Sequence, residues 1–431
     1  MDPRNHPDLL ELARASSGRL KGRNAPVHHF TQDSRQVRKG SLFFAIRGER
    51  FDGHDFVKEA FERGAVAAVV ERIPAGPEGN FILVEDTVVA LQRMAFHFRR
   101  RYLSGVEILA VGGAAGKTTT KEMLYRVLSS HFRTHRSPRS YNNHIGVPLT
   151  ILNTPPDSRF LVLEVGTNHP GEVKSLVDIA MNEYGLLTNI GPEHIEFFGS
   201  EEAIAREESH IFLHAKIGFA RREDISRFEG YMILPPKLLH PPALREALKR
   251  AQKREIGVVY GGIYFPNVAW LENALLVQEV AAYLGIENPL KYLRDFESES
   301  MRMEIFSVGD LQVINDAYNS NPLSLRSLFM SIAPSEKNLF VLGDMLELGR
   351  FSEYYHRKLA REMVEMGHTQ AVLIGKAMRH FFEEIQSRAH VDHFHEVDGA
   401  VGRIKERLKG KKRLILKGSR GIGLERILRY L

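Results

Sequence analysis

A short glycine-containing stretch constrains the fold of this chain more than any other feature. Residues 111–120 read Val-Gly-Gly-Ala-Ala-Gly-Lys-Thr-Thr-Thr, after an apolar run at 106–111 and before a helix expected at 119–130. Glycine allows a tight turn that directs backbone N–H groups at an anion, and the helix N-terminus adds partial positive charge. Lys117 can reach terminal phosphates, and the Thr118 hydroxyl suits Mg²⁺. The stretch therefore predicts a loop that binds a nucleoside triphosphate.

The match to the phosphate-loop pattern is incomplete, so a second interpretation stays open. The full pattern has a glycine at position 111, where this chain has valine. An ordinary strand-to-helix turn with a solvated lysine could have the same sequence, which matches only part of the full pattern. The strand and helix on either side favour phosphate binding. The loop residues that we expect to contact the nucleoside triphosphate are Gly113, Ala114, Ala115, Gly116, Lys117, Thr118 and Thr119.

Composition excludes several classes of site. The chain of 431 residues is long enough for about two to four domains, and it contains no cysteine, which removes disulfides, thiolate metal sites and cysteine nucleophiles. No uninterrupted apolar stretch of about 18 residues occurs, so no membrane span is expected. The first residues lack the apolar core of a signal peptide, so we expect a cytoplasmic protein.

The net charge of +6 is modest for this length, and part of it comes from basic residues between 403 and 413. We favour a solvated helix and turn as the interpretation of this run. A positive field that attracts an acidic substrate is the alternative. No interleaving of aromatic and basic residues accompanies the charge, so no nucleic-acid partner is expected.

The chain separates into three regions of alternating strands and helices. Residues 1–102 form a small unit, with strands expected at 41–46, 66–70 and 81–84 and helices at 56–62 and 88–100. Residues 103–298 open with the glycine-containing loop, and further strands are expected at 160–165 and 184–190. Residues 299–431 have expected strands at 312–315, 338–342, 371–374 and 413–416 and helices at 353–366, 376–388 and 420–431. This alternation predicts an α/β fold of mainly parallel sheets covered by helices. The segment 216–264 has weak periodicity, and its order is not predicted.

Two single residues follow apolar strands, at the sheet edge where the ligands of parallel sheets gather. Glu164 closes one strand and is placed to hold Mg²⁺ beside the loop, although an acid that simply faces water would have the same signature. His194 follows the next strand and is a candidate metal ligand, although a lone histidine is more often structural.

Two polar loops of the last region also come directly after strands. Residues 316–322 read Asp-Ala-Tyr-Asn-Ser-Asn-Pro, which suits stacking and hydrogen bonding to a nucleotide but equally suits a polar turn. Residues 417–421 read Lys-Gly-Ser-Arg-Gly and offer two cations and backbone N–H groups to an anion.

Taken together, these stretches are far more specific than any one of them. The chain resembles the Mur ligases of peptidoglycan synthesis, and most of all the MurF type, which joins D-alanyl-D-alanine to a UDP-N-acetylmuramoyl tripeptide. The resemblance is carried by residues 33–35, 52–56, 116–122, 141–148, 164–172, 316–322, 342–349 and 417–421. The paired Asn142 and Asn143 and the Asn-His-Pro-Gly-Glu text at 168–172 favour the MurF type over its relatives.

The resemblance implies three α/β domains: a small N-terminal domain for the UDP substrate, a central P-loop ATPase-like parallel sheet, and a Rossmann-like C-terminal domain. It implies a monomer that uses ATP and Mg²⁺ and takes UDP-N-acetylmuramoyl tripeptide and D-alanyl-D-alanine as substrates. The tripeptide carboxylate would attack the γ-phosphate, and the dipeptide amine would then displace phosphate from the acyl phosphate.

The resemblance also implies a role for each matching residue. Catalysis would depend on Lys117, Glu164 and His194. ATP contacts beyond the loop would come from Asn267, Asn273, Arg302 and Asp316. The UDP substrate would meet Ser34, Arg35, Asn142 and Asn143, and the peptide would meet Tyr318, Asn319, Lys417, Ser419 and Arg420. Magnesium would be held by Thr118, Glu164, His194 and Glu208.

The chain departs from the family pattern in three places. Glu208 stands where the family usually has a lysine modified to a carbamate, the stretch 213–265 is short, and residues 269–272 look inserted after Pro266, where a histidine is usual. These departures keep open the alternative of a Mur-like protein that binds UDP-sugar or nucleotide without ligating. A relative with another acceptor, such as a folylpolyglutamate or cyanophycin-type ligase, is the second alternative. The UDP-side text near Asp33 and Asp52 argues against the second.

Overall fold

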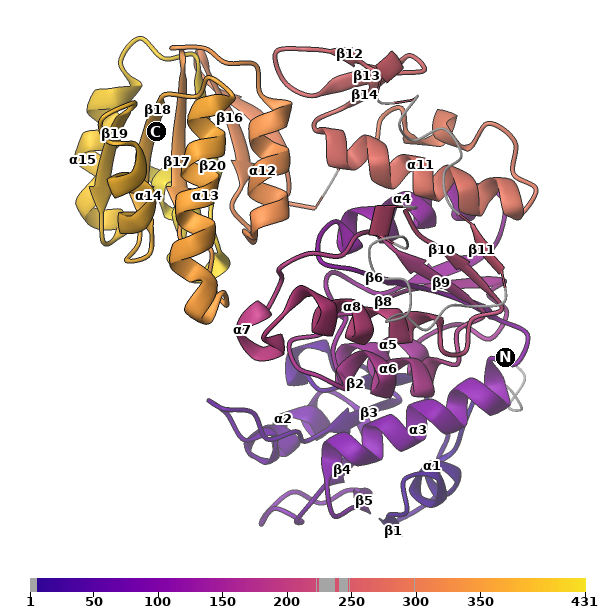
Figure 1. Cartoon of the computed structure of the whole chain (residues 1–431). Coiled ribbons are helices and arrows are strands. Elements are labelled where there is room, and N and C mark those ends of the chain that lie inside the picture. Colours follow the sequence, from indigo (N-terminus) through magenta and orange to yellow (C-terminus); the bar gives the residue numbers. More distant parts are fainter. Residues whose placement is uncertain (1–5, 222, 225–236, 240–246, 248, 298) are drawn as a thin grey trace.

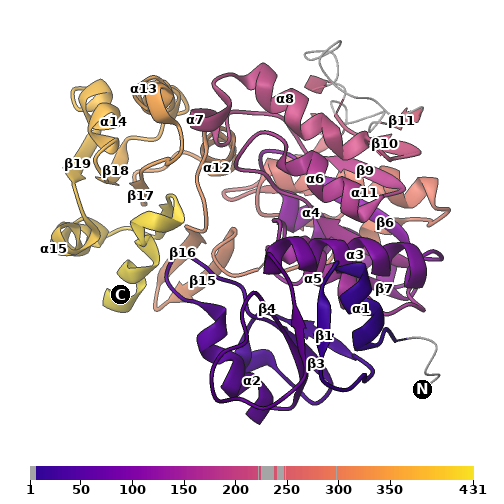
Figure 2. The ribbon, with the colours of Figure 1, turned by 90° about the horizontal axis from the view of Figure 1, so that it is seen from below.

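The structure is a computed structural model that describes residues 6–431 except 222, 225–236, 240–246, 248 and 298. Residues 1–5, which belong to the start considered for a signal peptide, lie outside the described residues. So do parts of the segment 216–264, for which no elements are predicted from the sequence. Three large sheets follow one another along the chain, and each has helices packed against it (Figure 1). Seen from below in Figure 2, the C-terminal lobe lies beside the other two lobes rather than in line with them. In the described part of the chain, no helix has the length and apolar character that a bilayer-spanning segment needs.

The N-terminal lobe is built on a five-stranded sheet of order β1-β5-β4-β3-β2, in which only the β1–β5 pair is antiparallel. The strands are β1 (Arg19–Lys21), β2 (His29–Thr31), β3 (Ser41–Phe44), β4 (Ala65–Val70) and β5 (Phe81–Leu83). The helices are α1 (Leu9–Ala15), η2 (Ser34–Gln36), η3 (Gly53–Phe56), α2 (Val57–Glu62) and α3 (Thr87–Tyr102). Helix α3 begins where the Asp86 side chain accepts hydrogen bonds from two backbone N–H groups of its first turn.

The central lobe is built on a six-stranded parallel sheet of order β11-β10-β9-β6-β8-β7. The strands are β6 (Glu107–Gly112), β7 (Thr134–Arg136), β8 (Phe160–Glu164), β9 (Tyr184–Leu187), β10 (Ile217–Phe219) and β11 (Lys237–Leu239). The helices are α4 (Lys117–Ser129), α5 (Gly146–Leu152), α6 (Glu172–Ala180), α7 (Ile195–Phe198), α8 (Glu201–Ser209), η4 (His210–Phe212), α11 (Val268–Tyr283) and η5 (Pro289–Leu293). Strand β8 is buried at every position, as a strand covered on both faces requires.

A small antiparallel sheet of β12 (Gln252–Lys253), β13 (Val258–Tyr260) and β14 (Ile263–Phe265) precedes α11. The C-terminal lobe then has a six-stranded sheet of order β15-β16-β20-β17-β18-β19, parallel except for the β15–β16 pair. Its strands are β15 (Glu304–Val308), β16 (Leu311–Asp316), β17 (Asn338–Gly343), β18 (Gln370–Ile374), β19 (His390–Phe394) and β20 (Arg413–Lys417). Its helices are α12 (Pro322–Ser331), η6 (Gly349–Phe351), α13 (Ser352–Glu365), α14 (Met378–Ile385), α15 (Val397–Leu408), η7 (Arg420–Ile422) and η8 (Leu424–Tyr430).

The prediction of an α/β fold with mainly parallel sheets is confirmed, but the α-helix expected at 420–431 is wrong. Two 3₁₀ helices, η7 and η8, occupy that segment. Gly423 separates them with a φ of 72°, a left-handed conformation that interrupts a continuous helix. For the basic residues between 403 and 413, the prediction of a helix followed by a turn is confirmed. Arg403 and Arg407 lie on α15, and both pair with Asp392.

Candidate active site

The turn between β6 and α4 has the backbone conformation of an anion-binding loop. Gly113 and Gly116 have φ values of 115° and 84°, in the region that favours glycine. Space requires glycine as well, since a Cβ at Gly113 would lie 2.3 Å from the Thr188 hydroxyl and one at Gly116 would lie 2.5 Å from the Asn273 amide nitrogen. Both glycines therefore place the N-terminus of α4 at the carboxyl edge of the central sheet.

The N–H groups of this loop divide into two sets. The first set is already bonded. The Gly113 N–H donates to a Glu208 carboxylate oxygen, and the N–H groups of Ala114 and Ala115 donate to the backbone and side-chain oxygens of Asn189, respectively. The first turn of α4, in contrast, has no side-chain cap. Because uncapped N–H groups and the helix dipole both favour negative charge, a phosphate group fits at the start of α4.

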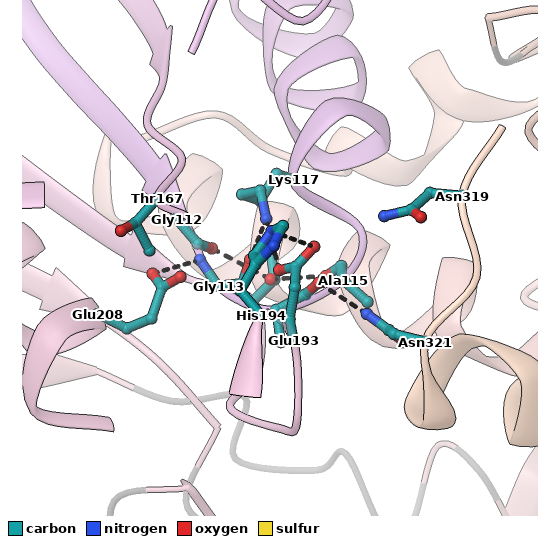
Figure 3. Close-up of polar contacts among 12 residues, drawn as sticks. Gly112, Gly113, Ala115, Lys117, Thr167, Glu193, His194, Glu208, Asn319 and Asn321 are labelled. Atoms are coloured by element: carbon teal, nitrogen blue, oxygen red, sulfur yellow. Dashed lines mark hydrogen bonds and ion pairs between the residues drawn. The ribbon is translucent and has the colours of Figure 1, made fainter. Parts of the chain in front are cut away.

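Lys117 occupies this helix start, and its ammonium group is already paired. Its Nζ donates to the Gly113 carbonyl at 2.6 Å and lies 2.9 Å from a Glu193 carboxylate oxygen (Figure 3). Burial alone would lower the pKa of Lys117, but the charges of Glu193 and Glu208 outweigh it, so the pKa is raised. Lys117 is therefore a cation ready to exchange Glu193 for a phosphate.

Glu164 and Thr118 form an oxygen-rich pair at the end of β8. The Thr118 hydroxyl and the Asn142 amide donate to one Glu164 carboxylate oxygen, at 3.1 and 3.0 Å. The other oxygen is buried and has no hydrogen-bond partner in the described residues, although the Lys121 ammonium lies 3.5 Å away. A hydroxyl and an under-satisfied carboxylate are ligands that Mg²⁺ prefers, so these two residues fit the ion.

His194 is held by the C-terminal lobe. Its Nδ1 lies 2.6 Å from a carboxylate oxygen of Glu347, a residue of the loop after β17. Burial would lower the pKa of His194, but the Glu347 contact and the Glu193 charge outweigh it, and the pKa is raised. Both His194 and Glu347 have positive φ, at 53° and 62°, which costs about 1–2 kcal/mol each. In this arrangement His194 is paired with an acid of the C-terminal lobe.

Glu208 contacts the backbone of the phosphate loop. Its carboxylate accepts the Gly113 N–H at 2.8 Å (Figure 3). Burial raises the pKa of Glu208 to about 7. Among the described residues, no three His, Asp or Glu side chains are arranged to hold a metal ion. The structure thus brings Thr118 and Glu164 together, while His194 and Glu208 are each engaged elsewhere.

The loop opens into a cavity of about 1350 Å³ between the lobes, and most of the expected site residues line it. Its C-terminal wall carries Arg302, whose guanidinium group lies 3.9 Å from the centre of the Tyr318 ring. Lys417 lines the same wall and lies 2.7 Å from the Asp316 carboxylate, so its charge is neutralised. The expected residues on the cavity wall are Ala114, Ala115, Gly116, Lys117, Thr118, Thr119, Asn142, Asn143, Glu164, His194, Asn267, Asn273, Arg302, Asp316, Tyr318, Asn319 and Lys417.

The remaining expected residues fall outside this cavity or have other contacts. The Ser34 hydroxyl donates to Glu59, and Arg35 pairs with Asp33 on the N-terminal lobe, and neither residue lines the cavity. Ser419 and Arg420 line a smaller neighbouring cavity instead. Asn267 caps α11 by accepting the Trp270 N–H at 2.7 Å. Residues 269–272, which look inserted in the sequence, belong to the continuous helix α11.

Sequence reasoning missed five residues that shape the site. Glu193 pairs with Lys117, Glu347 pairs with His194, and Lys121 reaches Glu164. Asn189 bonds the loop, and the Asn321 amide donates to the Ala114 carbonyl at 3.1 Å across the two lobes. Lys121 and Asn321 lie within the quoted motifs, and Glu193 directly precedes His194, so proximity to a motif was the signal that could have found them.

Family models match all three lobes. The model described as "Mur ligase family, catalytic domain" matches residues 26–98. "Mur ligase middle domain" matches residues 111–224, and "Mur ligase, glutamate ligase domain" matches residues 301–420.

Curated relatives match over nearly the full length. A UDP-N-acetylmuramoyl-tripeptide–D-alanyl-D-alanine ligase of Bacillus subtilis (strain 168) is 30% identical, with 100% of this chain and 99% of the relative covered. The protein of the same name from Escherichia coli (strain K12) is 26% identical, with 98% of each chain covered.

Solved structures share the fold. A MurF structure from Acinetobacter baumannii has a TM-score of 0.83 at 24% identity, with 99% of each chain covered. MurF ligase from Thermotoga maritima, solved in complex with ADP, has a TM-score of 0.77 at 24% identity, with 94% of this chain and 97% of that chain covered.

Proposed function

This chain belongs to the Mur ligase family, and we propose that it uses ATP to join D-alanyl-D-alanine to UDP-N-acetylmuramoyl tripeptide. The observation that carries the proposal is the loop at the start of α4, where an uncapped helix turn and the Lys117 ammonium group adjoin the Glu164–Thr118 pair. The full-length match to ligases of this name supports the same substrates.

The chemistry needs activation because a carboxylate is a poor electrophile. A carboxylate oxygen of the tripeptide attacks the γ-phosphorus of ATP, ADP leaves, and an acyl phosphate forms. The dipeptide amine then attacks the acyl carbon, loses a proton, and phosphate leaves as the amide forms. Two anions must approach each other in the first step, so most of the stabilisation of the transition state comes from cations held in position. Lys117 exchanges Glu193 for the β- and γ-phosphates in this proposal.

Magnesium is proposed for the Glu164–Thr118 pair. The buried Glu164 oxygen without a hydrogen-bond partner and the neighbouring Thr118 hydroxyl fit a hard cation. When bound there, the ion would supply positive charge that offsets the negative charge developing on the phosphates. His194 instead pairs with Glu347, and Glu208 accepts the Gly113 N–H, so we leave both residues out of this ion's ligand set.

The three lobes divide the work in this proposal. Residues 1–102 hold the UDP end of the substrate, residues 103–298 bind ATP, and residues 299–431 close over both. Contacts already tie the last lobe to the central lobe, since Asn321 donates to the Ala114 carbonyl of the phosphate loop and Tyr318 donates to the Ser140 hydroxyl between β7 and α5. Asn267, Asn273, Arg302 and Asp316 contribute to the ATP site from the cavity wall.

A single assay tests the proposal. Purified protein is mixed with ATP, Mg²⁺, UDP-N-acetylmuramoyl tripeptide and D-alanyl-D-alanine, and phosphate and pentapeptide product are followed together. We expect the two to form in equal amounts. Nucleotide binding without any product would support the binding-only alternative, which the altered residue Glu208 motivates. Product formed only with a different acceptor would show that the chain is a ligase of the same family with another acceptor.

A further inference from the structure

Arg302 lies between two residues with a left-handed backbone. Met301 and Met303 have φ values of 61° and 56°. Among the non-glycine residues that the structure describes, no other two with positive φ lie so close together in the chain. A residue with a Cβ atom adopts this conformation at a cost in free energy, and the conformation persists only where surrounding contacts hold it. The segment that carries Arg302 is therefore strained, and neighbouring groups have to fix its shape.

The side chain of Arg302 belongs to the wall of the phosphate-loop cavity. Its guanidinium group lies over the Tyr318 ring and donates to the Ser140 hydroxyl at 3.3 Å. Its Nε is buried and has no hydrogen-bond partner in the described residues. A guanidinium group has several N–H donors in one rigid plane, so the donors not used here can bind phosphate oxygens in the cavity. The position of this group depends on the backbone of the strained segment.

One carboxylate oxygen of Glu304 holds the first of the two strained residues. This oxygen accepts hydrogen bonds from the Met301 N–H at 3.1 Å, the Ser300 hydroxyl at 3.2 Å and the Asn315 amide at 3.0 Å. Glu304 begins β15 and lies opposite Asn315 of β16. These two strands form the edge of the C-terminal sheet that lies nearest the other lobes (Figure 2). Glu304 thus fixes the turn before it to the sheet.

Met303 is held by a residue that the proposal already places at the ATP site. The Asp316 carboxylate accepts the Met303 N–H at 3.1 Å and pairs with Lys417. Asp316 lines the phosphate-loop cavity, so a change there would alter the site directly. Glu304, in contrast, lines neither this cavity nor the smaller neighbouring one. Its route to the nucleotide is the backbone that carries Arg302.

We propose that Glu304 is a positioning residue for ligation, because it holds Met301 in the left-handed conformation and so keeps Arg302 in place for the ATP phosphates. The inference rests on the ATP site of the proposed function. Arg302 is restricted from two sides, by the Tyr318 ring and by its own backbone, so little conformational entropy is lost when it binds phosphate. Without Glu304, Met301 relaxes to negative φ, and the direction of the next side chain changes.

Glu304→Ala tests this role against a purely structural one. We expect kcat/KM for ATP to fall about tenfold or more, the scale of a lost charged hydrogen bond, while the KM of D-alanyl-D-alanine changes by less than about twofold. Glu304→Gln keeps an oxygen that accepts the Met301 N–H, so its kcat/KM for ATP should stay within about threefold of the unaltered protein. An unchanged kcat/KM for ATP in Glu304→Ala, whatever its Tm, would overturn the inference.

A double-variant cycle measures whether Glu304 acts through Arg302. Arg302→Ala removes the group that Glu304 positions, so adding Glu304→Ala to that variant should lower kcat/KM for ATP no further. If the two losses multiply in the double variant, Glu304 acts by another route, and the inference is overturned.

Glu336→Ala is the matched control, with Tm measured for every variant. The Glu336 carboxylate also accepts hydrogen bonds from two side chains of the same lobe, the Thr369 hydroxyl and the Gln370 amide, but Glu336 lines neither cavity. This variant should lower Tm and leave kcat/KM for ATP unchanged. An equal loss of kcat/KM in Glu336→Ala and Glu304→Ala would mean that general destabilisation causes the effect, and would overturn the positioning role.

Binding of a non-hydrolysable ATP analogue, measured by calorimetry with Mg²⁺ present, separates this inference from the ligase function. Glu304→Ala should raise the Kd of the analogue about tenfold. Weaker binding in Glu304→Ala, with no ligation product from the unaltered protein, would remove the ligase function and leave the positioning role. Product from the unaltered protein, with equal analogue affinity in both proteins, would overturn the positioning role and leave the ligase function.

Discussion

The ammonium group of Lys117 lies 2.9 Å from the carboxylate of Glu193, and both side chains are only 12% exposed. The lysine of the phosphate loop is thus held by an internal anion at the place where a triphosphate is expected. Glu193 lies 3.7 Å from His194, which in turn contacts Glu347 of the C-terminal lobe. A row of alternating basic and acidic side chains therefore connects the phosphate loop with the C-terminal lobe.

Glu193→Gln should lower the KM for ATP several-fold. The substitution keeps the shape of the side chain but removes the charge that competes with phosphate for Lys117. Steady-state kinetics at saturating tripeptide and acceptor measure the change. Glu196→Gln, at an exposed position of the neighbouring helix α7, is the control and should leave the KM unaltered. An unchanged or higher KM in Glu193→Gln would show that the pair does not compete with the nucleotide.

Lys117→Ala should reduce kcat by about 100-fold or more while the protein stays folded. The substitution removes the cation that the proposal places on the transferring phosphate. Lys174→Ala, which breaks an exposed pair with Asp178 on α6, controls for the general loss of a lysine. Parent-like turnover in Lys117→Ala would refute the role of the loop.

Glu164→Gln should raise the Mg²⁺ concentration needed for half-maximal activity by about tenfold or more. The amide keeps an acceptor for the Thr118 hydroxyl but removes the negative charge that a divalent cation requires. Activity is titrated with Mg²⁺ at constant ATP. Glu172→Gln, on the rim of the same cavity, is the comparison variant. Identical Mg²⁺ curves for Glu164→Gln and the parent would exclude Glu164 as a ligand.

Glu208→Gln should change how stability depends on pH. Burial raises the pKa of Glu208 from 4.5 to about 7, so the folded protein binds a proton that the unfolded chain releases above pH 4.5. The stability that this proton contributes is fully present below about pH 4.5 and is lost as the pH rises to about 7. The loss amounts to about 3 kcal/mol for a shift of this size.

Thermal unfolding of the parent and of Glu208→Gln at several pH values checks this expectation. Glutamine does not titrate and can still accept the Gly113 N–H, so the Tm advantage of the variant should grow between pH 4.5 and 7 and then stay constant. A Tm difference that does not vary with pH would mean that the Glu208 carboxylate keeps an ordinary pKa.

The local sequence predicted the site residues that lie in the glycine-containing loop and the one at the end of the neighbouring strand. The glycine turn, Lys117 and Thr118 are contiguous, and Glu164 ends the neighbouring strand β8, which pairs with β6. Parallel strands present their carboxyl ends at one edge, so the meeting of Thr118 and Glu164 follows from strand order. The fold class followed in the same way from the alternation of strands and helices.

Contacts between lobes could not be predicted, because they depend on packing across large sequence separations. The His194–Glu347 pair and the Asn321–Ala114 hydrogen bond each join segments more than 150 residues apart. Glu208 was expected near the metal from family position alone, yet its side chain reaches the Gly113 N–H. The helix expected at 420–431 is wrong because it contains Gly423, whose left-handed conformation divides the segment into two 3₁₀ helices.

The central claim is that ATP activates the tripeptide carboxylate as an acyl phosphate. The transfer of an oxygen atom from that carboxylate to phosphate tests this claim most directly. The tripeptide substrate is labelled with ¹⁸O in the carboxylate that becomes the new amide, and the phosphate released during ligation is analysed by mass spectrometry. Activation by ATP through an acyl phosphate predicts one ¹⁸O atom in each phosphate, formed in step with the pentapeptide product. Phosphate without label, or phosphate released with no amide product, would contradict the account.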